Sequence, residues 1–230
     1  QNLSVVLASL EDVETCGDFA AVGVVKRFGF PAVVLTNQVR ATPETVDHVV
    51  AFLEKHRAAT GFVVDLRSAN GGAELLARRI ASCFCAQDVV YAKSQVRDGP
   101  QAEDFGPTRD RVLKATKNPL AAPVVCLIGP GCVSSGEGFA KMMRALPNVS
   151  LVGRNTGGSS GNPAPFALPG LDVTVWYSRW VDLLPDGTPV EDRGIAPDIV
   201  VDAPASEYRN EDPTWTKAIE VLSAKVQGRS

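Results

Sequence analysis

The chain has 230 residues, of which 45% are hydrophobic and 21% are charged, and its formal net charge is −3. This is the composition of a globular protein long enough for one large domain or two small ones. The sequence has no basic tract, so nucleic acid is not an expected partner, and no apolar run approaches the ~18 residues that span a bilayer.

The cysteine pattern does not indicate a disulfide framework. The count is odd for a chain of this length, and the positions are Cys16, Cys83, Cys85, Cys126 and Cys132. Metal sites need cysteine or histidine pairs at ligand spacing, and the two histidines, His48 and His56, supply no such second pair. We therefore expect buried free thiols, and neither a metal nor a cofactor.

Apolar, β-branched runs alternate along the chain with runs of helical periodicity. The pattern predicts strands at 31–37, 61–67, 88–99, 122–130, 149–153, 172–183 and 198–201. It predicts helices at 42–60, 71–85, 137–147 and 212–226. The helix after Thr42 has the clearest start, because Thr42 is a plausible N-cap and Pro43 occupies the first helical position.

This alternation predicts an α/β fold with a mainly parallel, helix-covered sheet. In such sheets the loops at the carboxyl ends of strands carry the chemistry. Two loops qualify, DLRSANGG at 65–72 and GPGCVSSGEG at 129–138. The Pro- and Gly-rich segment 155–172 is expected to form a loop-rich wall or hairpin layer packed on the same core.

Ser134 is the first candidate catalytic residue. It follows a buried strand and a Gly-Pro-Gly turn and precedes a helix, so free backbone N–H groups and the positive end of the helix dipole lie beside it. That setting suits a nucleophile with an oxyanion hole. The same residues, Ser134 to Glu137, also match the S-x-x-E capping box, and Ser135 could cap the helix while Ser134 faces a cleft.

Three further stretches carry weaker signals. Asn70-Gly71-Gly72 follows a strand and allows backbone N–H groups to approach a ligand, or it is an ordinary tight turn. The stretch 155–163 either lines a cleft or links two elements. Glu191 becomes relevant only if the fold brings it to Ser134.

Four motifs in this order resemble the tail-specific, or C-terminal-processing, serine protease family. They are GFVVDLRSANGG, PVVCLIGPGCVSSGEGFA, VSLVGRNTGGSSGNP and GTPVEDRGIAPDIVV, and they cover roughly residues 60 to 203. The chain is more similar to the branch that contains the tricorn protease core and the interphotoreceptor retinoid-binding protein modules. The resemblance implies a crotonase-like core, and residues 1–230 are expected to be a single peptidase-like domain of a longer chain, without a PDZ domain.

The resemblance also implies roles for particular residues. Ser134 is the expected nucleophile, and the amide of Ser135 with the Gly71-Gly72 loop forms the expected oxyanion hole. Glu191 matches the acidic position of the tricorn-like branch. Further residues are expected to line the cleft, namely Asn70, Thr156, Gly157, Gly158 and Ser159.

The general base is where the sequence departs from its relatives. The processing-protease branch places a catalytic lysine after the VG-x-x-T-x-G stretch, and this chain has Ser159 there. The tricorn-like branch uses a histidine from an upstream segment, and no histidine precedes His48. A preceding segment or a partner subunit of a homo-oligomer is therefore the expected source of the base.

The sequence thus predicts a serine peptidase that cleaves polypeptides near their C-termini through an acyl-enzyme. Two alternatives stay open on the same fold. One is a catalytically degenerate module that binds peptides or apolar ligands, and the other is an acyl-thioester enzyme of crotonase type. Relatives favour a periplasmic or secreted location.

Overall fold

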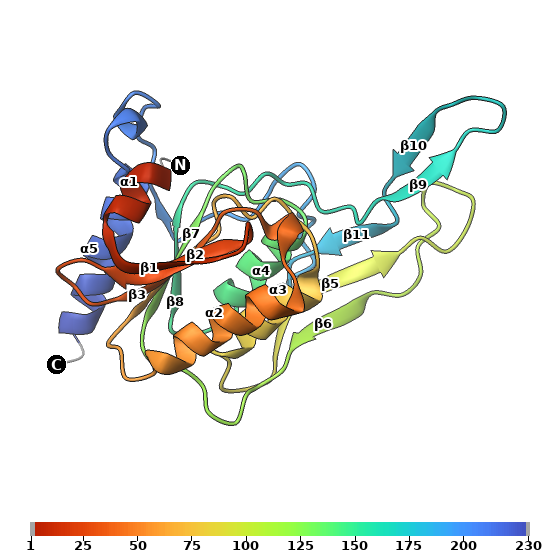
Figure 1. Ribbon diagram of the computed structural model, residues 1–230. Helices are drawn as coiled ribbons and strands as arrows, with labels where there is room; N and C mark the ends of the chain where they lie inside the picture. Colours follow the sequence, from red (N-terminus) through yellow and green to blue (C-terminus); the bar gives the residue numbers. More distant parts are fainter. Residues whose placement is uncertain (1–2, 229–230) are drawn as a thin grey trace.

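The computed structural model describes residues 3–228, which build a central sheet of seven strands with helices on both faces (Figure 1). The strand order is β1-β2-β3-β4-β7-β8-β12. The strands are β1 (Leu10–Cys16), β2 (Ala20–Val25), β3 (Pro31–Leu35), β4 (Phe62–Asp65), β7 (Val124–Ile128), β8 (Val149–Gly153) and β12 (Ile199–Val200).

Strand direction in this sheet follows the connections between strands. The first three strands are joined by short turns and pair antiparallel. From β3 onward each neighbour is parallel, and helices form the crossovers between β3, β4, β7 and β8. The expectation of a mixed α/β fold with a mainly parallel sheet is confirmed.

The helices cover the two faces of the sheet unequally. They are α1 (Leu3–Ala8), α2 (Pro43–Lys55), α3 (Glu74–Ser82), α4 (Ser135–Arg144) and α5 (Pro213–Gln227), with short 3₁₀ turns at Gln38–Arg40 and Glu207–Arg209. Helices α2, α3 and α4 share one apolar core with Val64, whereas α1 and α5 share the other with Val63. Consecutive strand residues point to opposite faces, so each central strand serves both cores. None of these helices, within residues 3–228, has the length and apolar character needed to cross a membrane.

A smaller antiparallel sheet lies beside the main one and consists of β5 (Val89–Val96), β6 (Arg109–Leu113) and β11 (Trp180–Leu183). A separate hairpin, β9 (Ala164–Ala167) with β10 (Thr174–Tyr177), projects from the body beyond it (Figure 1). We call residues 162–178 the arm. Its strands are exposed, so the expectation that this region packs on the main core is wrong for the arm.

The single strand expected at 172–183 is also wrong, because the chain bends between β10 and β11. Ser178 and Arg179 turn back beside the start of the arm, where the Ser178 hydroxyl and the Arg179 N–H both donate to the Gly161 carbonyl. The Arg179 side chain donates to Asn162. These bonds join the two ends of the arm, and they separate β10 from β11 into different sheets.

The structure adds elements that the sequence pattern did not predict. Residues before 31 form α1, β1 and β2, and β6 pairs with β5. Helix α4 begins at Ser135, two residues earlier than expected, with Ser134 in the N-cap position. The two serines are therefore the last residue of the turn and the first residue of the helix.

Candidate active site

Ser134 lies at the sharp corner between β7 and α4. Its backbone has φ 54° and ψ −124°, a left-handed conformation that non-glycine residues rarely adopt. Holding such a residue costs about 1–3 kcal/mol, and residues of this kind cluster at functional sites. The corner half-exposes the Ser134 side chain at the N-terminus of α4.

The Gly71-Gly72 loop touches this corner from the end of β4. Both glycines have positive φ, 99° and 128°. A Cβ on Gly71 would lie 3.1 Å from the Ser134 Cβ, and one on Gly72 would lie 2.7 Å from the Gln38 carbonyl oxygen. Only glycine allows the loop this close to the serine.

The amides around Ser134 are available to an oxyanion. Within residues 3–228 the N–H groups of Gly71, Gly72 and Ser135 donate no hydrogen bond to another residue. The Ser135 hydroxyl donates to the Gly72 carbonyl, so it joins the two loops and does not cap α4. The expected division of roles, with Ser135 as the cap, is therefore wrong.

Glu137, in the first turn of α4, anchors the corner through a fully buried carboxylate. Its Oε2 accepts the N–H groups of Ser134 and Ser159, both at 3.1 Å. Its Oε1 accepts the Gly158 N–H at 2.8 Å and the Thr156 hydroxyl at 2.6 Å. We call these five residues the Glu137 cluster, and every donor in it is uncharged.

The loop 156–160 connects the nucleophile corner to the segment around Glu191. The Thr156 N–H donates to the Ile195 carbonyl at 3.1 Å, and the Ile195 N–H donates to the Thr156 hydroxyl at 2.7 Å. The Ser160 N–H donates to Glu191 Oε2 at 2.9 Å. Glu191 is thus one hydrogen bond from the loop that also binds the Ser134 backbone.

A second buried carboxylate, Asp182 on β11, lies on the other side of Ser160. The Ser160 hydroxyl donates to Asp182 Oδ2, which also pairs with the Lys141 ammonium. The Arg111 guanidinium donates to Asp182 Oδ1 at 2.8 Å and also pairs with Glu74. We call Asp182, Lys141, Arg111, Glu74 and Ser160 the Asp182 cluster.

In the Asp182 cluster, burial and the neighbouring charges shift the pKa values of Lys141 and Glu74 in opposite directions. Burial lowers the pKa of the Lys141 ammonium, and the Asp182 carboxylate offsets part of that shift. Burial alone would raise the pKa of Glu74, but the Arg111 guanidinium and the Tyr91 hydroxyl bring it below its usual value. Glu74 is therefore ionised near neutral pH and is a weak proton acceptor.

Ser134 and residues of both clusters line one cavity of about 350 Å³. Its walls are Gly72, Glu74, Ser134, Ser135, Ser160, Asn162, Pro163 and Trp180. The Trp180 ring stacks on the Arg111 guanidinium, and its N–H donates to the Ser160 carbonyl. The nucleophile therefore opens into a pocket whose floor is polar and whose rim is the start of the arm.

None of the other residues expected to line the cleft is among the residues that line this cavity. Thr156 and Gly158 are buried behind Ser134 on Glu137, while Gly157, Ser159 and Asn70 are exposed. His48 pairs with Glu14 and His56 bonds the Phe52 carbonyl, so neither histidine lines the cavity. In the described part of the chain no group of three or more His, Cys, Asp or Glu side chains is placed to hold a metal.

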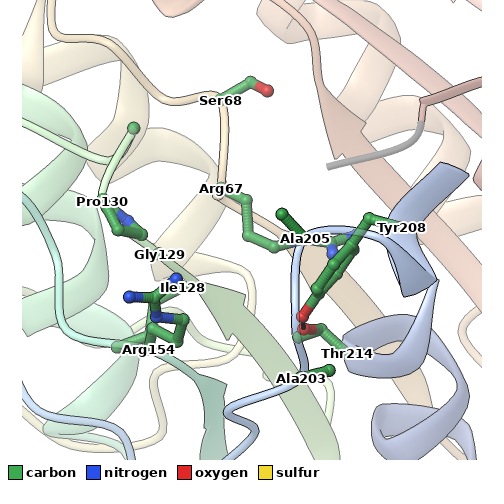
Figure 2. Close-up of a pocket in the computed structure, with 11 residues that line it drawn as sticks. Arg67, Ser68, Ile128, Gly129, Pro130, Arg154, Ala203, Ala205, Tyr208 and Thr214 are labelled. Carbon is green, nitrogen blue, oxygen red and sulfur yellow. Dashed lines mark hydrogen bonds between the residues drawn. The ribbon is translucent and has the colours of Figure 1, made fainter.

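A larger cavity, of about 470 Å³, is lined in part by the Gly-Pro-Gly turn, together with Arg67 and Tyr208 (Figure 2). Arg67 crosses it and pairs with Asp65 at 2.6 Å and with Asp212, the N-cap of α5, at 2.7 Å. A Cβ on Gly131 would lie 2.6 Å from the Arg67 carbonyl oxygen, so the turn rests on this residue. The ionic group supports the corner from behind and contains no nucleophile.

The comparisons with known proteins agree with this geometry. Residues 22–201, well over half of the chain, match the sequence profile of peptidase family S41. This chain belongs to peptidase family S41. The resemblance read from the four motifs is therefore confirmed.

Three relatives of this S41 chain illustrate the range of similarity. The tricorn protease of Thermoplasma volcanium is 26% identical over 175 residues, which are 73% of this chain and 15% of that protein. A crystal structure of a candidate peptidase from Parabacteroides merdae has a TM-score of 0.80 at 25% identity, covering 93% of this chain and 67% of that one. The photosystem II D1 C-terminal processing protease shares the fold, with a TM-score of 0.56 at 19% identity over 80% of this chain and 47% of its own.

The sequence reading missed the Asp182 cluster of this S41 chain. Lys141, on α4 two turns after Ser134, makes a buried ion pair with Asp182. The available signal was a charged residue within an apolar run, Asp182 in WVDLL and Lys141 in FAKMM. The pairing of these charged residues depends on the position of β11, and no local sequence pattern predicts that position.

Proposed function

We propose that this chain is a serine peptidase domain in which Ser134 attacks a peptide carbonyl. The observation that carries the proposal is the strained Ser134 at the N-terminus of α4, in contact with a glycine loop whose amides are free. The substrate is a polypeptide cut near its C-terminus. Membership of family S41 supports the reaction, while the specificity near C-termini rests on the resemblance to the processing proteases.

The proposed reaction has two steps. Ser134 Oγ adds to the carbonyl carbon, and the oxyanion is stabilised by the amides of Gly71, Gly72 and Ser135. Collapse of this intermediate expels the amine, and water then hydrolyses the ester on Ser134. Removing one such donor in other enzymes costs about 10²–10³ in kcat, so these backbone amides are a major part of the proposed catalysis.

We propose that the base comes from outside residues 1–230, either from another part of a longer chain or from a second subunit. Within the described residues the cavity is lined by neither a histidine nor a lysine, and Arg111 and Tyr91 lower the basicity of Glu74. Glu191 then orients this base, since it already binds the Ser160 amide at the edge of the site.

We also propose that the core is crotonase-like. What supports this is the parallel arrangement of β4, β7 and β8, with two strand-end loops supplying the amides beside Ser134. We propose in addition that residues 1–230 form one peptidase-like domain.

Hydrolysis of a quenched fluorescent peptide by the natural protein containing this chain tests the function. We expect Ser134→Ala to lower kcat/KM by at least about a thousandfold, as loss of a nucleophile does in other serine hydrolases. Glu191→Gln should lower kcat, whereas Asp186→Asn, in an exposed turn, should not. Hydrolysis that survives in Ser134→Ala would refute the assignment, and peptide binding without any hydrolysis would favour the degenerate module.

A further inference from the structure

The arm, residues 162–178, exposes a large apolar surface that the rest of the described chain does not cover. Asp172 is its only charged residue. Large apolar side chains along it are 44–65% exposed, namely Phe166, Leu171, Val173, Val175, Trp176 and Tyr177. Soluble monomers rarely leave such contiguous apolar surface uncovered.

Both faces of the arm are apolar. In the β9–β10 register Phe166 lies opposite Val175 and Ala164 opposite Tyr177, which places these four side chains on one face. Pro165 lies opposite Trp176, which places the indole on the other face. The arm projects from the body, so neither face is buried by its own chain (Figure 1).

An isolated two-stranded ribbon is marginally stable in water, and it needs further packing to persist. Addition of another strand along β9 is disfavoured, because Pro163 and Pro165 have no N–H to donate. Strand β10 contains no proline, so the arm can be covered on its two faces and along the outer edge of β10.

We propose that the arm is a dimerisation element, covered by a second copy of this chain. A two-fold interface needs a self-complementary surface, and a nearly uncharged arm meets its own copy without like-charge repulsion. A polypeptide substrate is the less suitable occupant. It would cover one face, and only during turnover, whereas a second copy covers both faces at all times.

The exposed area is sufficient for a stable dimer. Aromatic side chains bury about 150–250 Å² each when fully covered, so half-exposed ones leave roughly 500 Å² per arm with their aliphatic neighbours. If each arm packs against the partner's arm on one face and the partner's body on the other, the interface totals roughly 1,500 Å², within the range of stable complexes. The inference does not depend on the peptidase activity.

Sedimentation velocity over a wide range of protein concentration tests the proposal. We expect a dimer for the wild type and a monomer for the double variant Phe166→Ser/Trp176→Ser. Val200→Ser, at an equally exposed position on β12 outside the arm, should remain a dimer. Circular dichroism confirms that each variant is folded, since the arm lies outside both cores.

Disulfide cross-linking gives a second measurement. All five native cysteines are buried, so a cysteine introduced by Thr174→Cys or Val175→Cys provides an exposed thiol on one face or the other. One of the two should form covalent dimers on oxidation, and Val200→Cys should not. A monomeric wild type, or a dimer that survives the double variant, overturns the proposal. A monomer whose arm variants raise only the KM for polypeptides would instead assign the arm to substrate binding, and this too overturns it.

Discussion

Two buried carboxylates lie on either side of the loop 156–160, and they are satisfied in opposite ways. Glu137 accepts bonds from three backbone N–H groups and a hydroxyl. Asp182 pairs with two cations and one hydroxyl. Glu137 therefore fixes backbone geometry at the nucleophile, whereas Asp182 balances charge beneath the cavity.

The largest expected effect is the loss of Glu137. Glu137→Ala leaves the Thr156 hydroxyl and the Gly158 and Ser159 N–H groups without an acceptor, whereas the Ser134 N–H keeps the Ser159 carbonyl. At about 1–3 kcal/mol for each of these three donors, we expect the free energy of unfolding to fall by roughly 3–9 kcal/mol. Thermal unfolding should then move down by roughly 10 °C or more. Glu137→Gln keeps one carbonyl oxygen and should lose less. A Glu137→Ala variant that unfolds at the wild-type temperature would show that Glu137 does not hold the nucleophile corner in place.

Loss of Asp182 should come next, and it should be partly reversible. Asp182→Ala leaves Lys141 and Arg111 buried with fewer partners, and breaking such a pair from one side costs about 3–5 kcal/mol. Adding Lys141→Met removes one unpaired charge, so the double variant should be more stable than Asp182→Ala alone. Urea unfolding measures both. A double variant no more stable than Asp182→Ala would show that Asp182 does not balance the charge of Lys141.

Through Glu74, the Asp182 cluster should also make the free energy of unfolding depend on pH. The pKa of Glu74 is lowered in the folded state from 4.5, so its contribution is fully present above pH 4.5 and is lost as pH falls through the folded pKa. Urea unfolding from neutral to acidic pH should therefore show less acid loss in Glu74→Gln than in the wild type. Equal acid profiles for the two proteins would show that Glu74 contributes no such dependence.

The smallest expected effect concerns strain at the corner. Ser134 is kept at φ 54° by the Glu137 cluster, and glycine adopts this conformation without the steric cost. Ser134→Gly should therefore be more stable than Ser134→Ala by roughly 1 kcal/mol, since both variants lack the hydroxyl. Matched thermal melts of the two variants decide this, and a less stable glycine variant would mean that the corner is unstrained.

The sequence predicted the parts of the fold that depend on local pattern. Continuous apolar strands and the Thr42-Pro43 helix start identified the parallel sheet and α2, and the N-cap at Thr42 is confirmed, because its side chain accepts the Thr45 N–H. The Gly-Pro-Gly sequence after an apolar strand likewise predicted the turn at 129–133 before α4. Strand β1 was missed because it is mostly exposed and lacks a continuous apolar run. Strand β2 is a buried apolar run, AAVGVV, so its signal was present in the sequence.

The candidate site could be predicted only where it follows the chain closely. Ser134 and Gly71-Gly72 lie in the loops that follow buried strands, so their meeting follows from the parallel pairing of β4 with β7. The Asp182 cluster joins residues from α3, α4, β6 and β11, and no local pattern fixes the position of β11. The Pro- and Gly-rich composition of 155–172 predicts a loop-rich wall or hairpin layer, but composition does not indicate that the hairpin projects away from the core.

We propose that the corner between β7 and α4 presents a reactive serine. Treatment of the natural protein with a fluorophosphonate, followed by peptide mass spectrometry, tests it most directly. We expect an adduct on Ser134 that disappears in Ser134→Ala and forms more slowly in Glu191→Gln. An adduct on Ser135, Ser159 or Ser160 instead, or no adduct on a folded protein, would contradict it.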